Sequence, residues 1–177
     1  FFESLLETTA DEIDSAYGLL AEYIEYPEDR SWVIFKLRDA IQFSDGSPLT
    51  VEDVLFSYNL LREKGLPSFR AVLEKDVKDV TIISNSKIKF TFHEDTPKRD
   101  LINTVGSLPV FSKSYFIDND VDFEKSTLIP ALGSGPYVLE TLDVGKKIVY
   151  SRNKNYWGTN LAINRGRYNF DRFRIEY

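Results

Sequence analysis

The chain has 177 residues, of which 42% are hydrophobic and 14% aromatic, enough for one or two apolar cores and too many for a disordered segment. Its net charge of −6 comes from mixed acidic and basic residues with no basic block of five or more, which disfavours a nucleic acid partner. The absence of cysteine excludes disulfides and thiolate metal sites.

The N-terminal part of the chain predicts a docked segment followed by a strand. Residues 1–10 are apolar and then acidic, and we expect a short helix or turn that packs on the body. Residues 26–30 carry the Pro and Asp of a turn. The alternation that follows over residues 31–37 has a period of two and predicts a strand with one strongly apolar face.

A helix is predicted over residues 51–63. Thr50 stands before the first apolar residue and Asp53 follows three residues later, which resembles a capping box with Asp in place of Glu. Apolar residues then recur at helical spacing up to Gly65, with Pro67 just beyond, so the helix should end there.

The rest of the chain predicts mostly strands. The expected elements are a hairpin, a short helix, an acidic loop, a second hairpin and a final strand, at residues 77–92, 100–105, 118–124, 137–151 and 170–177. The sum is an α+β chain. A shift in composition near residues 118–130 suggests a boundary between two packing units.

No metal site or cofactor is predicted. Residues 118–122 begin like a calcium loop with alternating acidic residues. Phe123 and Ile129 stand where that loop needs its glycine and its last acidic ligand, so a solvated acidic loop is the better interpretation.

Catalytic motifs are also missing, and we predict no catalytic residue. Gly133 and Gly135 begin like a dinucleotide fingerprint, but Val138 replaces the third glycine and a strand follows instead of a helix. Ser134 lacks the outer glycines of a nucleophile elbow. The only histidine, His93, is expected on the surface at a strand end.

The two tryptophans are expected to have different places. Trp32 lies within the strand of residues 31–37 and is predicted to be in the core. Trp157 follows Tyr156 and precedes Gly158 in a turn. We expect Trp157 to be an aromatic anchor that closes this turn onto the body, although a stacking surface for a ligand remains open.

Four stretches stand out in this order: FESLL at residues 2–6, the longest and most specific stretch at 35–58 (LR, then F-x-DG-x-P-x-T-x-ED-V and SY), GSGPY at 133–137, and RN with YWG at 152–158. Together they resemble the oligopeptide- and dipeptide-binding family of bacterial extracellular solute-binding proteins, family 5. Two shorter motifs, at 18–22 and 164–171, resemble the branch of peptide importers also known for taking up microcin C.

The resemblance implies a fragment of a bilobed periplasmic-binding-protein fold of type II, with mixed sheets and flanking helices. Residues 1–125 would be the extra, second domain, and residues 126–177 part of the first lobe, with the large C-terminal lobe outside this chain. The segment that resembles the ligand side in relatives is Gly133, Ser134, Gly135, Pro136 and Tyr137. Its glycines would let backbone amides approach a peptide, and Tyr137 could stack or hydrogen-bond. A plain strand-entry turn is the competing interpretation.

The implied function is that of the substrate-binding component of an ABC importer, which captures oligopeptides in the periplasm and delivers them to a membrane permease. It would be a monomer without cofactor, and not an enzyme. The alternatives are a receptor for another solute (a dipeptide, an opine, a sugar or a metal chelate), a sensor module, and a hydrolase using Asp11 and Asp14.

Overall fold

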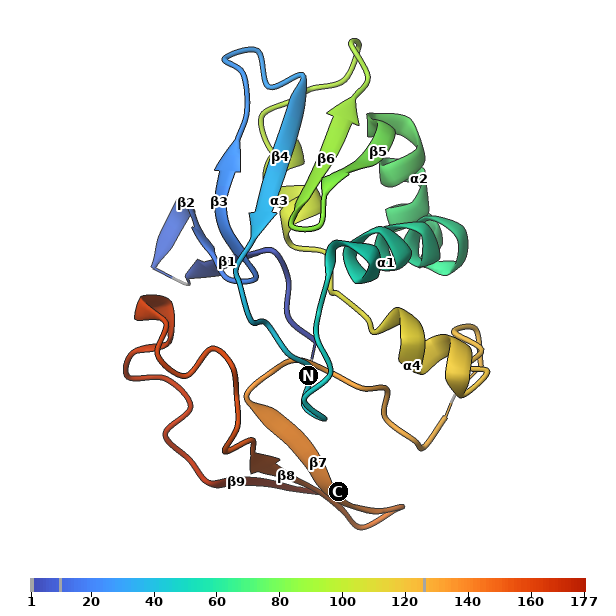
Figure 1. Cartoon of the computed structure of the whole chain (residues 1–177). Coiled ribbons are helices and arrows are strands. Elements are labelled where there is room, and N and C mark those ends of the chain that lie inside the picture. The colour runs from blue at the N-terminus through green and yellow to red at the C-terminus, as the bar shows by residue number, and fades with distance from the viewer. Residues whose placement is uncertain (1, 10, 126) are drawn as a thin grey trace.

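The computed structural model describes residues 2–9, 11–125 and 127–177, which form three antiparallel sheets joined by short helices (Figure 1). The strands are β1 (Leu6–Thr9), β2 (Glu12–Gly18), β3 (Ala21–Glu25), β4 (Trp32–Leu37), β5 (Val77–Ser84), β6 (Lys87–Phe92), β7 (Tyr137–Asp143), β8 (Lys147–Arg152) and β9 (Arg172–Glu176). The helices are α1 (Val51–Lys64), α2 (Pro67–Asp76), α3 (Leu101–Gly106) and α4 (Lys113–Asp118), with a 3-10 turn at Ala162–Asn164. The α+β class is therefore confirmed.

The main core lies under the four-stranded sheet, whose strand order is β3-β4-β6-β5. Alternate residues of β4 and β6 are buried, as the period of two predicts. Phe90 is central, because its ring meets Phe35 at 5.7 Å and Tyr58 of α1 at 5.6 Å between centroids, both edge to face. Helices α1 and α2 thus cover this sheet, and the rings of Phe35, Phe90 and Tyr58 pack together between the sheet and α1.

Most of the predicted elements are confirmed. Helix α1 begins after Thr50 with a capping box to Asp53, and its last turn ends at Gly65. The hairpins β5–β6 and β7–β8, helix α3 and strand β9 all form within a few residues of their predicted bounds.

Two expectations were wrong, and two helices were missed. Residues 6–9 form a strand instead of a helix or turn, because β1 pairs with β2 and places Leu6 in the core. Trp32 is half-buried and not in the core, since it lies on the outer face of β4 with the Lys89 ammonium 4.8 Å from its ring. Helices α2 and α4 were not predicted. Pro67 does lie just beyond the end of α1, as predicted, but it is also the first residue of α2, a position that tolerates proline.

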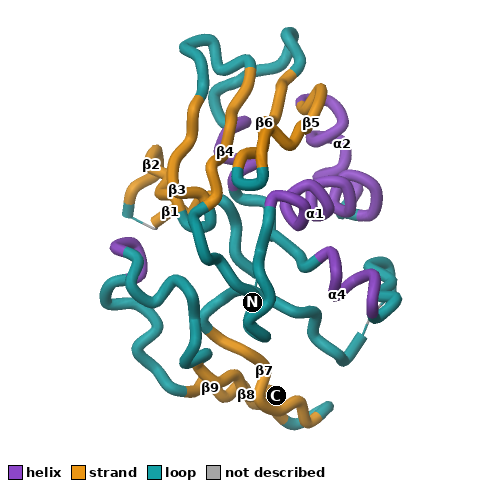
Figure 2. Tube along the Cα trace, viewed as in Figure 1, coloured by secondary structure: helices purple, strands orange, loops and turns teal. Residues whose placement is uncertain are grey.

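A second unit is formed by β7-β8-β9 and the loops at residues 153–171 (Figure 1). Figure 2 shows loops running between this unit and the four-stranded sheet. Backbone hydrogen bonds join these crossing segments: Val110 N donates to Glu3 O at 2.9 Å, and Ser44 N donates to Gly133 O at 2.9 Å. A domain boundary near residue 125 falls in the loop between α4 and β7 and stays a prediction.

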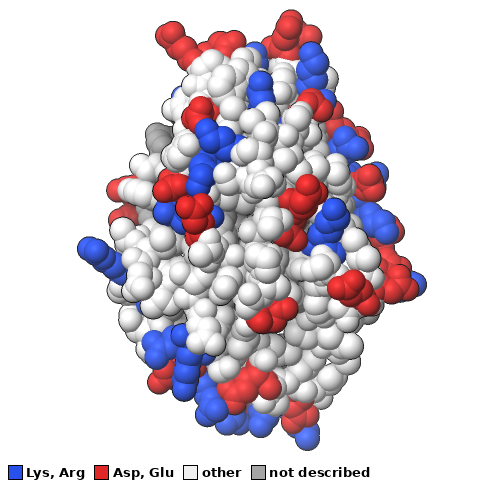
Figure 3. Space-filling model, viewed as in Figure 1, with Lys and Arg blue, Asp and Glu red and all other residues white. Residues whose placement is uncertain are grey.

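The charged side chains on the face shown in Figure 3 are interspersed in sign, and its middle is largely uncharged. In the second unit, Arg152 pairs with Asp171 at 2.5 Å and Arg172 with Glu140 at 2.8 Å. Exposed pairs of this kind contribute little to stability, about 0–1 kcal/mol each. They do balance much of the positive charge that residues 137–177 carry.

Candidate functional site

The predicted ligand-side segment contributes to a pocket of about 440 Å³ between β7 and the loop that follows α4. Gly133 and Tyr137 line it from that segment, and Phe2, Tyr115 and Tyr150 add aromatic rings. No lining residue carries a formal charge. The volume and the mainly apolar lining are those of a small-ligand or side-chain pocket.

Tyr137 is less available than the sequence suggested. Its side chain is only 4% exposed, and its hydroxyl donates to Phe170 O at 2.7 Å. Its ring packs on Phe173 of β9 at 4.6 Å between centroids. The hydroxyl is thus already used inside the protein, and what Tyr137 can offer a ligand is part of its ring and its backbone.

Ser134 and Pro136 of the same segment are also engaged inside the protein. Ser134 is 1% exposed, and its hydroxyl lies by the Glu3 carboxylate outside standard hydrogen-bond geometry. Pro136 O accepts from Asn153 N at 2.7 Å, and Gly133 O accepts from Ser44 N. The segment is thus tied on both sides by its own carbonyl groups.

Beneath this segment lies a buried polar cluster centred on Glu3. The Glu3 carboxylate accepts from the Tyr156 hydroxyl and, at 2.8 Å, from the Trp157 indole N–H. Asn164 Nδ2 donates to Tyr156 Oη at 3.1 Å and to Gly158 O at 2.8 Å. Trp157 is therefore the predicted anchor, and what it binds is a carboxylate from the other end of the chain.

The electrostatics of this cluster follow from its burial. Burial raises the pKa of Glu3 above its ordinary value, and the hydrogen bonds from Tyr156 and Trp157, with the nearby Ser134 hydroxyl, only partly oppose the rise. Burial, together with the neighbouring Glu3 carboxylate, also raises the pKa of Tyr156. Tyr156 therefore stays a neutral donor at every physiological pH.

The long signature stretch of residues 35–58 has a structural role. The Asp53 carboxylate accepts from Thr50 N at 2.8 Å and from Lys113 N at 2.9 Å, so it caps α1 and holds the start of α4. Ser57 Oγ donates to Asp53 O at 2.6 Å and accepts from Phe111 N at 2.7 Å. The stretch thus fixes the crossing segment that precedes α4.

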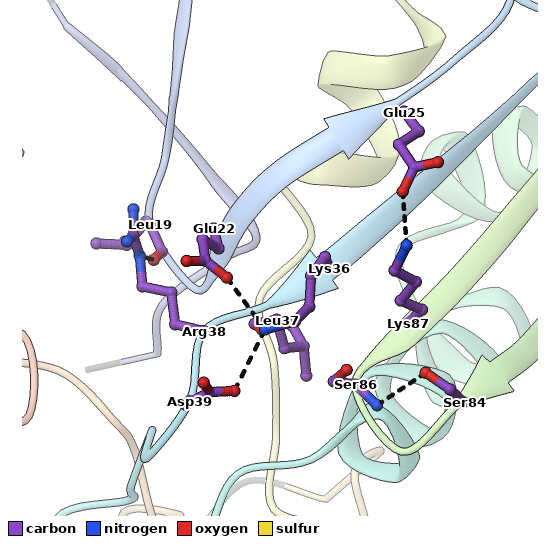
Figure 4. A network of polar contacts seen from close by, with 10 residues as sticks. All are labelled: Leu19, Glu22, Glu25, Lys36, Leu37, Arg38, Asp39, Ser84, Ser86 and Lys87. Carbon is purple, nitrogen blue, oxygen red and sulfur yellow. Dashed lines mark hydrogen bonds and ion pairs between the residues drawn. The ribbon is translucent and has the colours of Figure 1, made fainter.

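The same stretch also holds the corner between β2 and β3 (Figure 4). Arg38 Nε donates to Leu19 O at 2.8 Å. Lys36 Nζ reaches between Glu22 at 3.0 Å and Asp39 at 3.2 Å. This network of backbone carbonyls and ion pairs explains why the signature carries Arg after Leu37.

Among residues 2–9, 11–125 and 127–177, no group of three acidic or histidine side chains could hold a metal ion. His93 is exposed directly after β6, as predicted. Asp11 is exposed in the turn after β1, and the Asp14 side chain lies outside the described part. No helix of the described part is long and apolar enough to cross a membrane.

Comparisons with known proteins agree on one class, the solute-binding proteins. The family model for bacterial extracellular solute-binding proteins, family 5 Middle, matches residues 15–177. The "Peptidoglycan-binding protein YepA" and the "Probable peptide-binding protein YejA", both from Agrobacterium fabrum, are 36% and 33% identical over 99% and 96% of this chain. The structure of HbpA2 from Haemophilus parasuis superposes with a TM-score of 0.77 at 24% identity, covering 99% of this chain and 36% of that one.

The chain belongs to the family 5 bacterial extracellular solute-binding proteins, which confirms the resemblance drawn from the four stretches. It spans 28% of the length of each of these two curated relatives. The fragment interpretation of the fold agrees with this share.

Proposed function

We propose that the full-length protein is the substrate-binding component of an ABC importer and captures oligopeptides for delivery to a membrane permease. The observation that carries the proposal is the family 5 match over residues 15–177, and a relative named as peptide-binding supports the ligand class. The receptor would act in the periplasm as a monomer and release its ligand unchanged.

In this proposal the chain contributes the extra domain, residues 1–125, and part of the first lobe, residues 126–177. Gly133, Ser134, Gly135, Pro136 and Tyr137 would lie at the ligand side. The uncharged pocket beside them would accept an apolar or aromatic side chain of the peptide, because its lining is mainly apolar and aromatic and no charge there could pair with an ionised group.

The test uses the full-length receptor and calorimetry with a peptide library. Tyr137→Ala should raise the peptide Kd about tenfold, which corresponds to about 1.4 kcal/mol. Tyr137→Phe should bind almost like wild type, because the hydroxyl is committed to Phe170 O. Tyr26→Ala is the matched control, because Tyr26 is an exposed tyrosine directly after β3.

Each other result has a clear meaning. Unchanged affinity of a folded Tyr137→Ala receptor would contradict the ligand-side placement. A receptor that ignores peptides but binds a dipeptide, an opine, a sugar or a metal chelate would contradict the oligopeptide assignment. Cleaved peptide in the calorimeter cell would contradict a non-enzymatic role.

A second ligand class comes from the relative named as a peptidoglycan-binding protein. Peptides carrying amino sugars from the cell wall therefore belong in the same assay. If such a compound displaces plain peptides and binds at least tenfold more tightly, cell-wall peptides are the better assignment. The motifs that resemble the microcin C branch predict that microcin C competes as well.

A further inference from the structure

Stretches that are far apart in the sequence converge on one carboxylate. Glu3 belongs to the first stretch, Ser134 to the third, and Tyr156 and Trp157 to the fourth. All four meet in the buried cluster, where Glu3 is 7% exposed and Tyr156 is 6% exposed. Stability alone does not require a charge here, since replacing buried ionic groups by apolar ones is often neutral or stabilising.

The cluster lies directly behind the wall of the uncharged pocket. Phe2, the neighbour of Glu3, lines that pocket, and so does Gly133, the neighbour of Ser134. The backbone of Glu3 is fixed as well, because its carbonyl accepts from Val110 N at 2.9 Å. The Glu3 side chain therefore connects the fixed Phe2 side of the pocket with the Gly133 side, and loss of its contacts would free the Gly133 side to move.

We propose that Glu3 is a positioning residue, whose buried carboxylate seats the Gly133–Tyr137 segment and the turn at Tyr156 against the N-terminal segment and so shapes the ligand pocket. This inference rests on the proposed function. The carboxylate suits the task because it is an acceptor on both oxygens, and each oxygen has a donor: the Tyr156 phenol on one and the Trp157 indole N–H on the other, with the buried Ser134 hydroxyl close by.

Glutamine at this position has the same shape but only one acceptor oxygen. If that oxygen serves the Trp157 N–H, the amide nitrogen faces the Tyr156 hydroxyl, which already accepts from Asn164 Nδ2. The hydroxyl hydrogen then has no acceptor. The mismatch predicts that Glu3→Gln unseats the segment and that Tyr156→Phe, which removes the hydroxyl, relieves part of the effect.

The experiment uses the full-length receptor with Glu3→Gln, Tyr156→Phe and the double variant. Two backbone amides report locally whether the Gly133–Tyr137 segment keeps its position, because Ser44 N donates to Gly133 O and Asn153 N donates to Pro136 O. We expect Glu3→Gln to speed hydrogen exchange at Ser44 and Asn153 about tenfold and to raise the peptide Kd about tenfold. The double variant should bind peptide about twofold more tightly than Glu3→Gln alone, whereas additive effects would make it bind no more tightly.

Glu7→Gln is the matched control. Glu7 lies on β1, and its carboxylate pairs with Arg167 of the second unit at 3.3 Å while remaining half-exposed. This substitution removes the same charge from a neighbouring link between the same two units. It should leave the peptide Kd and both amides unchanged.

A purely structural role gives a different pattern. If Glu3→Gln only lowers the melting temperature, with peptide affinity and both amides as in wild type, the inference is overturned and the proposed function stands. If the wild-type receptor binds no peptide, the proposed function fails, and exchange at Ser44 and Asn153 alone decides the inference. Should Glu3→Gln not fold, Trp157→Phe, which removes one donor, must speed exchange at the same two amides or the inference falls.

Discussion

Gly158 shows at the level of a single residue how the buried cluster constrains the sequence. A Cβ at this position would lie 2.6 Å from Tyr156 Oη and 3.1 Å from Asn164 Nδ2. Both atoms are held by hydrogen bonds and cannot move away freely. The glycine of the YWG stretch is therefore required by the close approach of the tyrosine that precedes it.

Gly158→Ala should destabilise the protein by about 1–3 kcal/mol, because an added methyl group overpacks a well-filled site. Urea unfolding measures the change. Gly166→Ala is the comparison: Gly166 has φ of +75° and open space around it, so only its backbone conformation is penalised, at about 1 kcal/mol. A Gly158→Ala protein as stable as wild type would show that the cluster is loosely packed.

Glu3 predicts a pH dependence with a defined sign. Its pKa is raised in the folded protein, so the folded state holds the proton more tightly than the unfolded state does. The stability that it contributes is fully present below the ordinary pKa of 4.5 and is lost as pH rises through the folded pKa. The difference in unfolding free energy, wild type minus Glu3→Gln, should fall over that window.

Denaturant unfolding of the two proteins from pH 4 upward measures this difference. The subtraction removes exposed carboxylates such as Asp29 and Asp122, whose pKa values are lowered by hydrogen bonds to Ser31 and Glu124. These groups act in the opposite sense and are common to both proteins. Parallel stability profiles would mean that the Glu3 carboxyl titrates as it does in water.

Sequence reasoning found Trp157 as an anchor and missed Glu3 as its partner. The two are more than 150 residues apart, and no local period or spacing connects them. The one available signal was an acidic residue inside the apolar run FFESLL, because an ionisable group there needs a buried donor. The same limit applies to Tyr137, whose acceptor, Phe170 O, lies on another element.

At the level of elements, helix α1 is both a core element and a clamp. Its apolar side packs on β6, while Asp53 and Ser57 bind the segment that crosses toward the second unit. Ser57 is 1% exposed and is the only hydrogen-bond partner that we find for the Phe111 N–H in the described part of the chain. The helix thus fixes where the crossing segment runs.

Ser57→Ala should cost about 1–3 kcal/mol, because it leaves a buried N–H without an acceptor. The midpoint of urea unfolding reports the loss. Ser107→Ala removes an exposed hydroxyl that donates to Thr104 O, and its effect should stay within about 0.5 kcal/mol. Equal stability of the two variants would argue that Phe111 N finds another acceptor.

Local patterns predicted the elements that carry their own signals. These signals are the capping residues of α1, the period of two in β4 and β6, and the tight turns of both hairpins. Each signal is made by residues only a few positions apart in the sequence. Strand β1 has no such signal: four residues form it, and its pairing with β2 decides the conformation. Helix α2 was not predicted, because a proline such as Pro67 can either follow the end of a helix or stand as the first residue of one.

At the level of the whole molecule, two units of unequal charge are held together by few but buried contacts. Eight of the 22 Lys and Arg residues, but only four of the 28 Asp and Glu residues, lie in residues 137–177. The units therefore attract each other weakly at long range, and salt screens that attraction over about 10 Å. Register between them depends instead on Glu3 and on the Ser44 to Gly133 hydrogen bond.

This organisation predicts how limited proteolysis divides the chain. Residues 119–125 and 127–136 contain no helix or strand, and the Lys125 side chain is 82% exposed. Trypsin should cut first after Lys125, because a protease needs an accessible extended backbone, whereas Lys64 lies inside α1 and Arg152 inside β8. Mass spectrometry of early fragments identifies the cut and so tests the predicted boundary near residue 125.

The two fragments produced by the cut after Lys125 should stay together in size-exclusion chromatography under native conditions. Glu3 would still bind Tyr156 and Trp157 across the cut, and Gly133 O would still accept from Ser44 N. In the Glu3→Gln protein, whose shared cluster has lost an acceptor, the nicked pieces should separate more readily. An early cut inside β4, β6 or α1, or nicked pieces that part equally fast in both proteins, would show that the boundary or the contact that spans it lies elsewhere.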